Sequence, residues 1–181
     1  MAKDRPEFAL KLLETMVADE KDESRAFEFD LANVYYIHDR HADAEAHVRK
    51  AIERYPQYQR AWLCLGTLYY VTSRFEEAVE AYRHAIDLDG RDAWSMNNLG
   101  LLLLEQQQAE EALPLLVRAV ELRQDVPAFH NNLGMALEHT GRFRAAAAAY
   151  KAALTADPTY DRARQNMARV EAVKGIGEEP M

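Results

Sequence analysis

The 181-residue chain has a formal net charge of −8, with 22 lysines and arginines against 30 aspartates and glutamates. This acidic balance argues against nucleic acid and against an anionic membrane surface as partners, because both ligands call for clustered basic side chains. With one cysteine, Cys64, the chain cannot form an internal disulfide. The length is sufficient for one compact domain.

The first 24 residues are predicted to form an N-terminal helix followed by an acidic linker. Phe8, Leu12 and Met16 fall on roughly one face of a helix over 6–18. Acidic residues interrupt the apolar run that a secretory signal requires, and no apolar stretch reaches the roughly 18 residues of a membrane span. We therefore expect a cytoplasmic protein without direct membrane insertion.

From residue 25 onward the sequence repeats with a period of 34 residues. The residues at this spacing are Asn98, Asn132 and Asn166, and two series of alanines: Ala44, Ala78, Ala112 and Ala146, then Ala51, Ala85, Ala119 and Ala153. Such a period is typical of stacked helix pairs, in which each unit buries its apolar face against its neighbours. We predict repeat units over 25–58, 59–92, 93–126 and 127–160, a capping helix over 161–174 and a disordered tail over 175–181.

The residues at the packing positions resemble those of the tetratricopeptide repeat (TPR) family. The repeat 59–92 supplies Trp62, Leu65, Gly66, Tyr69, Ala78, Tyr82 and Ala85. The repeat 127–160 supplies Leu133, Gly134, Gly141, Ala146, Tyr150, Ala153 and Pro158. The resemblance extends over all four units. It implies an all-α fold: a right-handed α-solenoid of four helix-turn-helix TPR units with an extra helix at each end.

Two local features predict how each helix pair is built. The eighth place of each unit holds a small residue, which lets the two helices of a pair approach closely; these residues are Ala32, Gly66, Gly100 and Gly134. Ser73 and Glu76 have the spacing of a capping box, which predicts that the second helix of unit 59–92 begins there.

The resemblance also implies that the first helix of each pair lines a concave surface. The face left over after the packing positions gives a candidate peptide-binding groove of Asn33, Tyr36, Tyr70, Trp94, Asn98, Leu101, Asn132, Met135 and Asn166. Its apolar and aromatic members, with Leu104 beside them, are typical of a binding surface. Amides at regular spacing suit the backbone of an extended peptide, since each offers a donor and an acceptor.

The spaced asparagines resemble those lining the groove of the repeat domain in O-linked N-acetylglucosamine transferase. An alternative remains open, in which they stabilise the stack itself. In the N-terminal half, Asp30 and Cys64 occupy the equivalent places. There we expect apolar contacts instead, from Phe29, Tyr36, Leu63 and Tyr70.

The expected partner is another protein, bound through an extended or helical segment. Some family members grip C-terminal carboxylates of chaperones with basic groove residues. Here Phe29, Trp94 and Asn98 occupy those places, so a chaperone tail is not expected.

We find no sequence motif for catalysis. No glycine-rich phosphate loop is present, and Cys64 is interpreted as a packing residue because no base is paired with it. His38, His41 and neighbouring aspartates fall in a turn, and no second cluster completes a metal site. We therefore predict a non-catalytic interaction scaffold with no cofactor and no metal. Two alternatives remain: a self-assembling structural scaffold, hence a homo-oligomer, or an accessory subunit of an enzyme complex.

Overall fold

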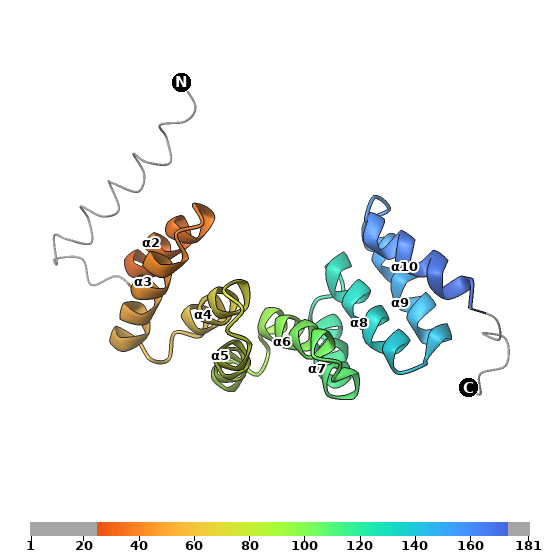
Figure 1. Ribbon diagram of the computed structural model, residues 1–181, viewed down its shortest axis with the longest axis horizontal. Helices are drawn as coiled ribbons and strands as arrows, with labels where there is room; N and C mark the ends of the chain where they lie inside the picture. Colours follow the sequence, from red (N-terminus) through yellow and green to blue (C-terminus); the bar gives the residue numbers. More distant parts are fainter. Residues whose placement is uncertain (1–24, 174–181) are drawn as a thin grey trace, which may run out of the picture. The chain divides into compact units, whose positions relative to one another are not determined.

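A computed structural model describes residues 25–173, which fold entirely into α-helices and turns (Figure 1). The helices within this range are α2 (Arg25–Ile37), α3 (His41–Arg54), α4 (Gln59–Val71), α5 (Phe75–Leu88), α6 (Ala93–Glu105), α7 (Ala109–Leu122), α8 (Pro127–His139), α9 (Phe143–Ala156) and α10 (Asp161–Glu171). The predicted N-terminal helix and C-terminal tail lie outside the described residues. The predicted all-α fold of helix pairs is confirmed.

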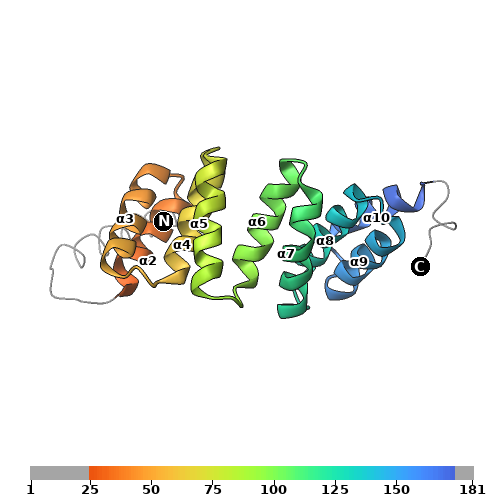
Figure 2. The same cartoon turned by 90° about the horizontal axis from the view of Figure 1, so that it is seen from below.

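The described residues divide into two compact units, the first ending at residue 90 and the second beginning at residue 91. In the described part of the first unit, α2 pairs with α3 and α4 with α5, and α3 packs against α4. In the second unit α6 pairs with α7 and α8 with α9, while α10 packs on α9 (Figure 2). No helix of the described residues is long and apolar enough to cross a membrane.

Small residues at the repeated positions allow each helix pair to close. The alanines of both series have at most 1% of their surface exposed. A Cβ atom built on Gly66 would lie 2.6 Å from the Tyr82 ring, and one on Gly134 would lie 2.4 Å from the Tyr150 ring. Such a separation is well inside van der Waals contact. The predicted close approach at the eighth place is therefore confirmed.

The turn inside each helix pair uses a residue with positive φ at the same place of the repeat. These residues are Asp39, Ser73, Gln107 and Gly141, with φ of 57°, 61°, 63° and 75°. The capping box predicted at Ser73 and Glu76 is wrong. Ser73 occupies the left-handed turn position, and α5 begins after Arg74, which makes no side-chain capping bond. The turn, not the capping spacing, decides where α5 begins.

Two further helix features depart from the regular repeat. Asp92 caps α6, because its carboxylate accepts hydrogen bonds from the backbone N–H groups of Trp94 and Ser95 at 3.1 and 3.3 Å. Pro114 lies inside α7 and is exposed, and the helix continues through it from Ala109 to Leu122. At the C-terminal end, α10 buries Ala163 and Val170 in the cluster around Tyr150.

Candidate functional site

In the first unit, groove residues from α2 and α4 enclose a cavity of about 220 Å³. Asn33 and Tyr36 of the predicted groove line it together with Phe29 and Leu63, which were expected to make apolar contacts. The full lining is Phe29, Asn33, Tyr36, Arg60, Leu63, Cys64 and Thr67. Asn33, Tyr36, Leu63 and Cys64 are each half-buried. The structure thus brings together, at one hollow, side chains that belong to two successive repeat units.

Contacts around the cavity hold its walls in place. The Phe29 ring meets Tyr58 edge to face, with centroids 5.3 Å apart, and the Arg60 guanidinium lies 5.3 Å from the Phe29 centroid. The Cys64 Sγ lies 4.0 Å from Asn33 Oδ1. Burial raises the pKa of the Cys64 thiol to about 11, so the thiol stays protonated at neutral pH. The cavity therefore offers apolar contact and a polar edge, and its thiol is a poor nucleophile.

In the second unit, five asparagines form a continuous chain of side-chain amides. Asn166 Nδ2 donates to Asn131 Oδ1 at 2.9 Å, and Asn131 Nδ2 donates to Asn132 Oδ1 at 3.4 Å. Asn132 Nδ2 in turn donates to Asn97 Oδ1 at 2.9 Å, and Asn97 Nδ2 donates to Asn98 Oδ1 at 3.2 Å. The three asparagines spaced by 34 residues are therefore joined through Asn97 and Asn131.

This amide chain changes what the spaced asparagines can offer to a ligand. Asn132 is 8% exposed, and both ends of its amide bond to neighbouring asparagines. Asn97 and Asn131 are buried as well. They too stand 34 residues apart in the sequence, and this spacing is the signal that links them to the repeat. Within the described residues, the Asn98 amide N–H₂ and the Asn166 carbonyl make no hydrogen bond and lie at the two ends of the chain.

The apolar groove candidates of the second unit differ in exposure. Trp94 is 46% exposed and meets Phe129 edge to face, with centroids 4.9 Å apart. Leu101 and Met135 are half-buried. Leu104 is only 3% exposed, so its expected place on the open surface is wrong, because neighbouring side chains cover it. Trp94 is thus the most accessible of these side chains.

A charged network links α10 to α8 and α9. Arg169 makes a two-pronged contact with Glu138, with Nε to Oε1 and Nη2 to Oε2 both at 2.8 Å. The Tyr150 hydroxyl donates to Glu138 Oε2 at 2.8 Å. The Arg169 hydrogen bond lowers the pKa of Glu138, and burial raises the pKa of Tyr150. The Glu138 carboxylate on α8 therefore contacts both Arg169 on α10 and Tyr150 on α9.

The lowered pKa of Glu138 predicts acid sensitivity of the second unit. The folded protein favours the ionised carboxylate, so this contribution to stability is full above the ordinary pKa of 4.5 and is lost as pH falls through the lower folded value. We expect Glu138→Gln to be less stable at neutral pH and to lose less stability than the wild type as the pH falls through that range. Urea denaturation at several pH values measures both effects.

Glu171→Gln is the matched control, because Glu171 is exposed and makes no ion pair among the described residues. It should retain the acid dependence of the wild type. An identical acid slope in wild type and Glu138→Gln would contradict the role of Glu138.

Residues 25–173 contain no group of three or more histidine, cysteine, aspartate or glutamate side chains that could hold a metal ion. The groove candidates offer an apolar hollow, an exposed indole, the unbonded N–H₂ of Asn98 and the unbonded carbonyl of Asn166.

Comparison with known proteins gives a consistent assignment. Two models described as tetratricopeptide repeat match the chain, one over residues 2–58 and 97–166 and the other over residues 58–125. A search of curated protein sequences finds no match.

Solved structures show the same fold. The structure of YrrB, described as a TPR protein with an unusual peptide-binding site, has a TM-score of 0.76 at 26% identity, covering 91% of this chain and 84% of that one. TTC0263, a thermophilic TPR protein of Thermus thermophilus, has a TM-score of 0.73 at 22% identity, with 95% and 93% covered. MamA from Desulfovibrio magneticus RS-1 has a TM-score of 0.75 at 15% identity, with 83% and 85% covered.

Proposed function

Because the chain belongs to the tetratricopeptide repeat family, we propose that it is a non-catalytic scaffold that binds a peptide segment of a partner protein. The fold of this family serves as a protein-interaction scaffold. The observation that supports this proposal most is the hollow between α2 and α4, because its lining includes the predicted groove residues Asn33 and Tyr36. YrrB, to which the chain is similar, is described as having a peptide-binding site.

The size of the hollow indicates what would enter it. At about 220 Å³ it lies below the roughly 300–1,000 Å³ of typical small-molecule pockets. It therefore suits one large apolar side chain of a bound segment. The rings of Phe29 and Tyr36 and the Leu63 side chain would contact that side chain, while Asn33 and Thr67 would meet the backbone beside it.

In the second unit the proposed peptide contacts are Trp94, Leu101, Met135 and the two ends of the amide chain. Asn98 would donate to a backbone carbonyl through its unused N–H₂ group, and Asn166 would accept from a backbone N–H. Asn132 would act by holding its neighbours, since its own amide is already bonded at both ends.

Peptides selected from a displayed random library on the wild-type protein test this proposal. We expect them to share a large apolar residue and to bind with micromolar affinity, about −8 kcal/mol. A double variant with Tyr36→Ala and Leu63→Ala should weaken binding by about tenfold or more, because truncating anchors at the centre of a contact costs above roughly 1 kcal/mol each. Isothermal titration calorimetry measures the change.

Val117→Ala is the matched control. Val117 is 38% exposed on α7, outside the predicted groove, so its truncation should leave affinity unchanged. Selected peptides that bind the double variant as tightly as the wild type would place the binding site elsewhere.

A further inference from the structure

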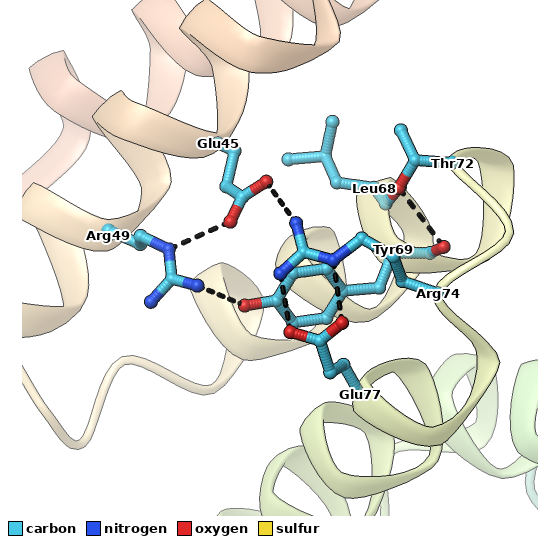
Figure 3. A network of polar contacts seen from close by, with 7 residues as sticks. All are labelled: Glu45, Arg49, Leu68, Tyr69, Thr72, Arg74 and Glu77. Atoms are coloured by element: carbon cyan, nitrogen blue, oxygen red, sulfur yellow. Dashed lines mark hydrogen bonds and ion pairs between the residues drawn. The ribbon is translucent and has the colours of Figure 1, made fainter.

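One arginine of the first unit is held by an aromatic ring and two carboxylates. The Arg74 guanidinium lies over the Tyr69 ring, 4.2 Å from its centroid, and bonds to Glu77 on one side and to Glu45 on the other, where Nη1 to Oε2 is 2.7 Å (Figure 3). Tyr69 is on α4, Glu45 on α3 and Glu77 on α5. On this face of the unit, an aromatic ring and two carboxylates thus surround a guanidinium of the chain itself.

The same face continues into a cavity of about 570 Å³ bounded by α3, α4 and α5. Trp62 and Tyr69 both line it, and they are two helical turns apart on α4, so their rings project from one side of the helix. The Trp62 indole is fixed in place: its Nε1 donates to the Pro56 carbonyl at 2.9 Å, and its ring centroid lies 4.0 Å from that of His84. The aromatic part of the cavity is thus preorganised.

The charges around this cavity are mostly negative. Four glutamates line it, and the one guanidinium among the lining residues, Arg49, is already bonded to Glu45 and the Tyr69 hydroxyl at 2.9 and 2.6 Å. Glu53 and Glu76 are exposed and make no hydrogen bond or ion pair within the described part of the chain. The cavity therefore combines aromatic walls with carboxylates that lack a cation.

We propose that this cavity is a docking site for an arginine side chain carried by a segment of a partner protein. The aliphatic stem would lie against the apolar side chains of the cavity, such as Ile52 and Trp62, and the guanidinium would meet carboxylates at its rim, where Glu53 and Glu76 make no ion pair. A planar guanidinium suits aromatic and carboxylate partners together better than an ammonium does. The site lies on a different face of α4 from the concave hollow and adds a second contact surface to the proposed scaffold.

The test uses the full chain labelled with ¹⁵N and a short acetylated peptide of alanine and serine with two arginines. The indole N–H signal of Trp62, identified with a Trp62→Phe variant, reports on the cavity. We expect a saturable shift with this peptide and almost none when citrulline, which is neutral and of the same shape, replaces both arginines. The double variant Glu53→Gln and Glu76→Gln should weaken binding about tenfold, because two exposed charge contacts are lost.

A control variant separates local from overall charge. Glu111→Gln with Glu171→Gln removes two exposed glutamates that make no ion pair in the described part of the second unit, and it changes the net charge equally. It should bind the arginine peptide as the wild type does. Equal shifts with the citrulline peptide, equal weakening by the control variant, or no shift of Trp62 at millimolar arginine peptide would each overturn the proposal. The concave variant with Tyr36→Ala and Leu63→Ala should keep this response, so the two sites are tested separately.

Discussion

Gly134→Leu is expected to lower the free energy of unfolding by about 3 kcal/mol, at the upper end of what overpacking a core costs. A Cβ atom on Gly134 would already lie 2.4 Å from Tyr150 Cε1 and 2.6 Å from Cδ1. The ring cannot easily retreat, because Tyr150 is fully buried and its hydroxyl is bonded to Glu138. For a protein of this size the change corresponds to a melting temperature lower by roughly 6–12 °C.

Alanine substitutions provide a graded comparison. Gly134→Ala gains up to about 1 kcal/mol of helix propensity but must still displace the Tyr150 ring, so we expect a net loss. Gly90→Ala is the control, because a Cβ atom there meets nothing within 4 Å. Urea denaturation followed by circular dichroism measures all three variants. A Gly134→Ala protein as stable as Gly90→Ala would show that helices α8 and α9 do not depend on this close approach.

A double-mutant cycle assigns the loss to one contact. In a Tyr150→Ala background the ring that opposes the new methyl group is gone, so adding Gly134→Ala should cost little or nothing further. A cost as large as in the wild-type background would locate the strain elsewhere.

The same packing explains why the fold could be predicted from sequence. An interval of 34 residues specifies which faces are buried before any contact is known, and the glycines and alanines at fixed places leave room for one arrangement of each pair. Ser73 shows the limit of local signals. Its spacing to Glu76 matched a cap, but the repeat requires a left-handed residue at that place, as at Asp39 and Gln107. A repeated structural requirement prevailed over a local motif.

The site could be predicted only in part, because a sequence gives donors and acceptors but not their pairing. Periodicity placed Asn33, Tyr36 and Leu63 on one face, where the structure has a hollow. It could not show that Asn132 bonds to Asn97, since that depends on side-chain rotamers across two helices. The cavity at Trp62 was also missed. Its glutamates have the pattern of a solvated helix surface, and only the packing of α3 and α5 on α4 brings them around an indole.

Asn132→Ala is expected to destabilise the second unit by about 2 kcal/mol, because the buried Asn97 carbonyl loses its donor and the buried Asn131 N–H₂ loses its oxygen acceptor. Asn98→Ala is the matched control from the same place of the previous repeat. Asn98 is half-buried and accepts a single bond at the end of the amide chain, so we expect a loss below about 1 kcal/mol. Urea denaturation of the two variants measures the difference.

The pair Asn97 and Asn132 tests whether the hydrogen bond itself is responsible. Asn97→Ala alone strands the Asn132 donor, whereas changing both residues to alanine removes donor and acceptor together. The double variant should therefore cost less than the sum of the single variants, by roughly 1 kcal/mol. Additive costs would mean that the two amides contribute through packing only. In that case the spaced asparagines would not form a connected chain, and Asn132 would be available to a bound peptide.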